Sequence, residues 1–180
     1  MAIFDHDYPV AHSLSPRLQD AVRQIEFARS YTLLSLEDLS DDDWYWCPEQ
    51  MDTHIAWQAG HLAMAQYGLT LFMQRGRAEV DSELMTGKFR KRFMKGTRPT
   101  RNRDDYPPVS EIRQVMERVH QQMREEIGSF DGDHLDEPAS EPHAAYATKL
   151  GSLLFASKHE MLHAGQIGML RRLMGKEPLR

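Results

Sequence analysis

Cysteine and long apolar runs are almost absent from this sequence of 180 residues. Cys47 has no partner for an intramolecular disulfide, and the acidic start from Met1 to Asp7 has no apolar signal segment. We therefore expect a protein of the reducing cytoplasm. No segment reaches the roughly 18 consecutive apolar residues of a membrane-spanning helix. The length predicts a single domain over residues 1–180.

Runs of β-branched residues are also rare, whereas methionine occurs 11 times, and this balance favours helices over strands. Four segments show apolar residues at helical spacing. The first opens at Ser15-Pro16 after an N-terminal arm, residues 1–14. Asp52 or Thr53 is the expected cap of the second segment. The predicted helices cover residues 15–36, 54–75, 108–128 and 149–174.

Two connections between these helices are long. Residues 77–109 show no sustained helical pattern, and residues 131–146 are interpreted as a surface loop because we find no convincing strand. The aromatic cluster Trp44-Tyr45-Trp46 is expected to close one end of the molecule. These features predict an all-α four-helix bundle, in which a long crossover lets helices two and three run parallel.

Two histidines on the last predicted helix are the strongest chemical feature. His159 and His163 are one turn apart, roughly 40° around the axis and about 6 Å along it, so both imidazoles can reach one ion. His61, on the second helix, lies among small and apolar residues and is the expected third ligand. A structural role in the core is the alternative for each histidine. Three neutral imidazoles would leave an open coordination position, as in catalytic metal sites.

The same letters match the His-Glu-x-x-His motif of zincin metalloproteases. We do not favour this interpretation, because a metzincin would continue with Gly and His where this chain has Gln166 and Met169. Only about 17 residues follow His163, and Glu177 is the sole acidic residue among them. A third ligand downstream is therefore nearly excluded.

Other residues near the histidines are candidates for supporting roles. Gln166, one turn after His163, could orient an imidazole or a bound water. Glu160 points away from its neighbouring ligand and is expected to face solvent or to support a ligand. His54 lies on the same side as His61 but two turns earlier, so we rate it an edge residue and a weak candidate for substrate binding.

Acidic residues outnumber basic ones, which gives a formal net charge of −5, yet residues 88–103 hold eight Lys and Arg residues and no acidic one. A solvated loop is the simplest interpretation. The alternative is a segment that binds a carboxylate or phosphate of a substrate, with Arg98 and Arg101 as weak candidates. Nucleic-acid binding through this segment is a further alternative, which the negative net charge disfavours.

Imidazole ligands suit zinc or nickel, with iron, cobalt and manganese as other choices. An ion with an open position lowers the pKa of a bound thiol or water and makes it a nucleophile at neutral pH. The sequence thus predicts a metal-dependent enzyme that transfers, isomerises or hydrolyses a small molecule. The alternative is a non-catalytic bundle that binds metal for stability or for a stress response.

Two motifs carry a resemblance to a known family. The second helix contains Gly-His-Leu around His61, and the last contains His-x3-His-x-Gly-Gln from His159 to Gln166. Over residues 15–179 the chain resembles the DinB-like family, also called the DinB/YfiT-like metalloenzymes. The resemblance implies an up-down-down-up bundle, a divalent metal held by His61, His159 and His163, and homodimers. Characterised relatives include S-transferases that use low-molecular-weight thiols and a maleylpyruvate isomerase, which implies such a thiol as a cofactor.

Overall fold

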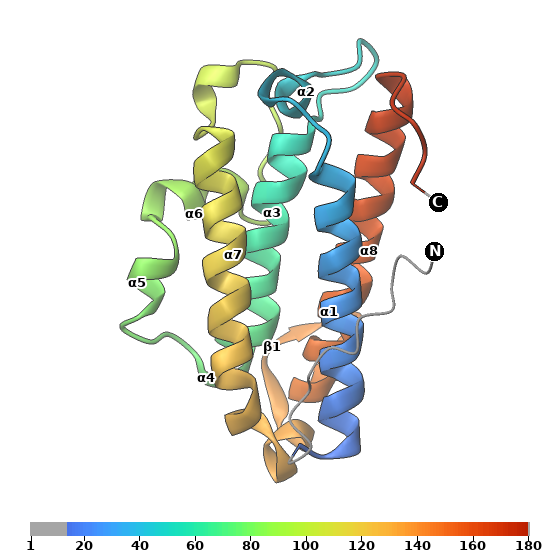
Figure 1. Cartoon of the computed structure of the whole chain (residues 1–180). Helices are drawn as coiled ribbons and strands as arrows, with labels where there is room; N and C mark the ends of the chain where they lie inside the picture. The colour runs from blue at the N-terminus through green and yellow to red at the C-terminus, as the bar shows by residue number, and fades with distance from the viewer. Residues whose placement is uncertain (1–13, 180) are drawn as a thin grey trace.

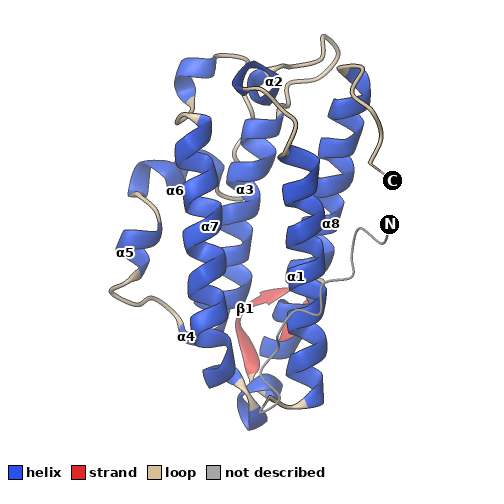
Figure 2. Ribbon diagram, in the orientation of Figure 1, coloured by secondary structure: helices blue, strands red, loops and turns tan. Residues whose placement is uncertain are grey.

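The computed structural model describes residues 14–179. The N-terminal arm predicted for residues 1–14 lies, apart from Leu14, outside the described residues. Within them the fold is mostly helical, with a small two-stranded hairpin (Figure 2). We find no helix in this part of the chain whose length and hydropathy would let it span a bilayer.

Four long helices in the described part lie side by side and form the body of the molecule (Figure 1). They are α1 Pro16–Leu36, α3 Ile55–Tyr67, α7 Val109–Glu126 and α8 Lys149–Leu173. α1 packs on α8, and α3 packs on both α7 and α8. In Figure 1, α1 and α8 run upward whereas α3 and α7 run downward, so the second and third long helices are parallel. This is the arrangement that the long crossover predicts.

Side-chain caps explain where two of these helices begin. Thr148 caps α8, because its Oγ1 accepts a hydrogen bond from the backbone N–H of Gly151. α3 is capped by His54, whose Nδ1 accepts from the backbone N–H of Trp57 at 3.1 Å. The prediction of Asp52 or Thr53 as this cap is therefore wrong. An imidazole lone pair here replaces the usual hydroxyl or carboxylate acceptor.

Beyond α3 the helical chain continues but changes its hydrogen bonding. Gly68–Phe72 forms a π-helical turn, η1, and Met73–Arg75 forms α4. Gly76 ends the run at φ 77° and ψ −155°, a positive-φ conformation that glycine adopts without steric cost. A π turn inserts an extra residue into a helix and frequently occurs beside functional sites.

The crossover between α4 and α7 contains only short helices, which agrees with the absence of a sustained helical pattern over residues 77–109. They are α5 Asp81–Leu84, α6 Gly87–Phe93 and η2 Arg103–Asp105. Phe89 and Phe93 are buried, so they fix α6 to the core, where this helix packs on α3. The crossover therefore covers the side of α3 that carries His61.

A hairpin replaces part of the loop predicted for residues 131–146, so the expectation of no strand is wrong. β1 Pro138–His143 pairs antiparallel with β2 Tyr146–Thr148, and His143 lies opposite Tyr146. The hairpin lies beside the start of α8 (Figure 2). The sequence did not predict this hairpin, because its strands are short and the first contains two prolines, so alternating apolar residues are lacking.

The apolar core runs between the long helices and is closed at both ends. At the end of the molecule where α2 (Asp41–Tyr45) connects α1 to α3 (Figure 1), Trp44 is fully buried, as predicted, whereas Tyr45 is half-buried and Trp46 is exposed. At the other end, the 3-10 turns η3 (Ile127–Phe130) and η4 (Gly132–Asp136) contribute further buried apolar side chains.

Candidate metal centre

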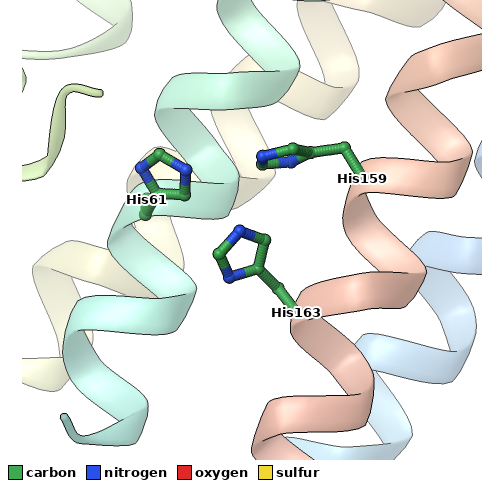
Figure 3. Close-up of side chains that lie close together, drawn as sticks. All are labelled: His61, His159 and His163. Atoms are coloured by element: carbon green, nitrogen blue, oxygen red, sulfur yellow. The ribbon is translucent and has the colours of Figure 1, made fainter. Parts of the chain in front are cut away.

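Helices α3 and α8 present three imidazoles to one point (Figure 3). His159 and His163 project from successive turns of α8, and His61 faces them from α3. The ring centroids are 4.6 Å apart for His159 and His163, 4.9 Å for His61 and His163, and 5.3 Å for His61 and His159. One nitrogen from each ring lies within 4.8 Å of the others. The structure thus brings the three predicted ligands together.

A hydrogen bond to the backbone fixes the orientation of His61. Its Nδ1 lies 2.8 Å from the carbonyl oxygen of Phe93, at the end of α6. Because a carbonyl oxygen can only accept, Nδ1 carries the hydrogen and Nε2 of the neutral ring keeps its lone pair. A contact of this kind is what a metal-binding imidazole needs on its other nitrogen.

The approach of Phe93 depends on the glycine before His61. A Cβ at Gly60 would lie 2.6 Å from Cζ of the Phe93 ring, far inside contact distance. The missing side chain therefore lets Phe93 rest on the backbone of α3 and bring its carbonyl oxygen to the imidazole. This gives a physical reason for the Gly-His pair in the sequence.

The orientation of His163 is fixed by a hydrogen bond to a side chain, that of Gln58. Nδ1 of His163 donates to Oε1 of Gln58 at 2.5 Å, and Nε2 of Gln58 donates to Oγ1 of Thr53 at 2.9 Å. The second bond holds the amide so that its oxygen faces the ring. Nε2 of His163 is consequently the nitrogen with a free lone pair.

Aromatic rings border the imidazoles. Trp57 stacks on His61 with ring centroids 5.0 Å apart and planes at 4°. Phe155 lies 5.8 Å from His159, which makes no hydrogen bond within the described residues. His159 is therefore held by packing, whereas the other two imidazoles are held by hydrogen bonds.

Burial keeps the three imidazoles neutral. Burial, followed by the neighbouring histidines, lowers the pKa of His163 to about 3 and that of His159 to about 4. Burial also lowers the pKa of His61, against the opposing hydrogen bond to Phe93. Imidazoles that are neutral at pH 7 offer lone pairs without first losing a proton.

This donor set fits a divalent transition metal. Within residues 14–179 the cluster consists of imidazoles, without carboxylate or thiolate. Two of the rings have their Nδ1 hydrogens engaged, so each offers Nε2 to the shared point. Three nitrogen donors leave an open coordination position, which is the arrangement of catalytic rather than closed structural sites.

The predicted supporting residues lie elsewhere. Gln166 is exposed and, within the described residues, has no hydrogen bond to an imidazole, so Gln58 occupies the position beside His163 that was predicted for Gln166. Glu160 is buried and pairs with Arg29 at 3.0 Å, on the side of α8 that faces α1. The expectation that Glu160 faces solvent or supports one of the three histidines is therefore wrong.

Within the described residues, the three weak candidates for substrate binding form no hydrogen bond or ion pair with His61, His159 or His163. His54 is buried as the cap of α3, packs edge-on against Tyr106, and has a pKa lowered by burial to about 4. Arg101 pairs with Asp52 at 2.7 Å and donates to backbone oxygens of the preceding loop. Arg98 is exposed and forms no ion pair within the described residues.

A pocket of 460 Å³ borders the site, and His61 and His159 contribute to its lining. The π turn η1, the hairpin and the α6 region supply most of the remaining wall. The sequence did not predict this pocket, because its wall comes from the strands and short helices that periodicity missed. It gives a small molecule access to the imidazoles.

A helical bundle that brings three neutral imidazoles beside a pocket defines a candidate metal-binding protein. Comparison with family models gives a match to the DinB superfamily over residues 24–167. The chain therefore belongs to the DinB superfamily, and the resemblance found in the sequence is confirmed. Comparison with curated proteins gave no match.

Proposed function

We propose that this protein is an enzyme that depends on a divalent transition metal and acts on a small molecule by transfer, isomerisation or hydrolysis. The observation that carries the proposal is the group of three imidazoles, with nitrogens within 4.8 Å of one another, at the wall of a pocket. Nitrogen donors favour zinc or nickel, with iron, cobalt or manganese as alternatives.

The chain's own residues have distinct parts in this proposal. His61 and His163 bind through Nε2, because Nδ1 of each donates to an oxygen. His159 supplies the third nitrogen. The ion, when bound, would lower the pKa of a coordinated thiol or water and so supply a nucleophile near neutral pH. From the family resemblance we favour a low-molecular-weight thiol, and hence S-transfer, among these reactions.

Elemental analysis of the untagged protein tests the proposal first. We expect about one equivalent of a transition metal in the wild type and its loss in His163→Ala, because two imidazoles hold an ion much less well than three. Gln166→Ala is the control, since this side chain is exposed and makes no hydrogen bond to the imidazoles of His61, His159 or His163. A wild type without metal even after reconstitution would contradict the proposal.

Turnover separates the enzyme from its main alternative. The metal-loaded protein is assayed with thiol-transfer, isomerase and hydrolase substrates, and His163→Ala is the negative control. Metal binding that raises the melting temperature without any turnover would favour a non-catalytic metal-binding bundle instead.

We also propose that the protein is a homodimer. Three exposed apolar side chains, Leu162, Met169 and Leu173, lie on one stripe of α8. A second copy that covers this stripe would remove them from water. Sedimentation analysis of wild type and Leu162→Gln/Leu173→Gln tests this, and a monomeric wild type would contradict it.

A further inference from the structure

The pocket beside the imidazoles combines an apolar wall with unpaired positive charge. Its volume of 460 Å³ lies within the range of roughly 300–1,000 Å³ that small-molecule sites occupy. Met94 lines the pocket although its side chain is 46% exposed. An apolar ligand would cover this side chain and remove it from water.

Aromatic rings form one wall of the pocket. Tyr146 and Phe155 line it with ring centroids 5.7 Å apart, and His143 stacks on Tyr146 at 4.9 Å. Phe155 in turn contacts His159. A flat apolar body placed against these rings would therefore lie next to the candidate metal ligands.

Positive side chains line the same pocket. They are Arg77 and Lys95, both exposed, and Arg90, whose guanidinium lies 5.2 Å from the ring centroid of Tyr67. Within residues 14–179 none of the three forms an ion pair. Glu141 also lines the pocket, so the lining carries a formal excess of two positive charges.

Three basic residues of the segment 88–103 that lie outside the pocket lining have acidic partners. Arg92 pairs with Asp105 at 3.0 Å and Arg103 pairs with Asp42 at 2.8 Å. Arg101 is likewise paired, with Asp52. The positive charge that remains available beside the imidazoles therefore belongs to residues of the pocket.

We infer that the substrate of this site is a small organic acid. Its apolar, aromatic-sized body lies against Tyr146 and Phe155, and its carboxylate is held by Arg77 and Lys95. Arginine and lysine form charge-assisted hydrogen bonds with carboxylates, which are roughly twice as strong as neutral ones. The inference rests on the proposed function only where it calls the ligand a substrate.

A matched pair of probes tests the inference. The affinities of 2-naphthoate and of its neutral amide, 2-naphthamide, are measured by NMR titration of the full chain, as purified and after chelation. Chelation matters because a carboxylate could otherwise bind the metal itself. We expect the chelated wild type to bind the carboxylate about tenfold more tightly than the amide.

Two double variants with equal loss of charge locate the preference. Arg77→Gln/Lys95→Gln should bring the ratio of the two affinities close to one. Arg98→Gln/Lys88→Gln removes one arginine and one lysine that are exposed and outside the pocket lining, and should keep the ratio within about twofold of the wild type. An equal fall in both variants would assign the preference to long-range attraction and overturn the inference.

The remaining outcomes are equally decisive. If neither probe binds, or if both bind equally to the wild type, the inference is wrong. Metal content of the same preparations separates it from the proposed function. A carboxylate preference in a protein that binds no metal would leave the pocket as an organic-acid site while the proposed enzyme fails. A protein that binds metal but shows no preference for the carboxylate would overturn the inference and leave the proposed function standing.

Discussion

At the scale of single residues, the amide of Gln58 sets how His163 presents its ring. Replacement by alanine removes the acceptor for Nδ1, so the ring can rotate and offer either nitrogen. Loss of such a contact typically weakens metal binding by about 10–100-fold. We expect Gln58→Ala to lower the metal affinity by this amount in a competition titration against a chelator.

The control for this variant is Gln166→Ala, which also removes one glutamine side chain near His163 in the sequence. Its side chain is exposed and, within residues 14–179, makes no hydrogen bond to an imidazole, so the metal affinity should stay at the wild-type value. A loss in Gln166→Ala as large as that in Gln58→Ala would show that the geometry assigns the wrong glutamine.

The histidines also predict how stability depends on pH in the metal-free protein. In the folded chain the pKa is about 4 for His159 and about 3 for His163, below the ordinary value of 6.5. As the pH falls below 6.5, the unfolded chain takes up protons that the folded chain does not. The free energy of unfolding should therefore decrease between about pH 7 and about pH 5.

Denaturant titrations at the two pH values measure this decrease. The double variant His159→Gln/His163→Gln lacks both groups, so its decrease should be smaller than that of the wild type. His54 is unchanged in both proteins and titrates in the same direction, because burial lowers its pKa to about 4. Equal decreases in both proteins would rule out the two imidazoles as the cause.

The grouping of the three imidazoles could be predicted from the sequence, but the residues that orient them could not. Spacing on one helix predicts that His159 and His163 share a face, and a histidine among small residues predicts the third. Gln58 lies one turn before His61, so the sequence contained a hint, yet its partner depends on how α3 packs against α8. Periodicity describes one helix at a time and contains no information on such contacts.

At the scale of elements, the contact between α6 and α3 positions His61. Gly60→Ala would place a Cβ inside the ring of Phe93, so the end of α6 must move away with its carbonyl oxygen. Overpacking of this kind costs about 1–3 kcal/mol of unfolding free energy. We expect that loss in denaturant titrations, together with weaker metal binding.

Gly165→Ala is a matched control in α8. A Cβ there meets nothing within 4 Å, so the substitution should raise stability by about 0.5–1 kcal/mol, as expected for alanine in a helix. The metal affinity should not change. If Gly60→Ala were also neutral or stabilising, Phe93 would have room to move, and the close approach would not be needed for His61.

The elements that could be predicted from the sequence are those in which apolar residues recur at helical spacing. The four long helices have apolar faces over several turns and recognisable ends, so sequence alone places them. The hairpin at residues 138–148 is stabilised by packing on α8 and has strands too short for a pattern. The π turn at Gly68–Phe72 retains helical apolar spacing, so only the backbone hydrogen bonds reveal it. Both unpredicted elements line the pocket.

At the scale of the whole molecule, a buried polar network joins the four long helices. Arg29 of α1 pairs with Glu160 of α8 at 3.0 Å and donates to Gln66 of α3 at 2.6 Å. Nε2 of Gln66 lies 2.9 Å from Nδ1 of His120 in α7, and Nε2 of His120 lies 3.2 Å from Oε2 of Glu26 in α1. Sequence patterns cannot predict this network, because its members are far apart in the chain.

The network predicts an asymmetry between single and double substitutions. Glu160→Leu leaves the guanidinium of Arg29 buried without its carboxylate, which should cost about 3–5 kcal/mol in the metal-free protein. Arg29→Met/Glu160→Leu removes both charges and should recover much of that loss, because apolar pairs often replace buried ion pairs at little cost. Denaturant titrations of the three proteins measure the difference, and a double variant no more stable than Glu160→Leu would contradict the argument.

Glu160→Gln distinguishes a role in the fold from a role at the metal. The amide can still accept a hydrogen bond from Arg29, so this variant should lose less stability than Glu160→Leu. Because Glu160 faces α1 rather than the imidazoles, its metal affinity should stay within about twofold of the wild type. A fall as large as the 10–100-fold expected for Gln58→Ala would instead place Glu160 among the residues that orient His159. We expect the stability and the metal affinity to change independently, since the network and the metal centre lie on different faces of α8.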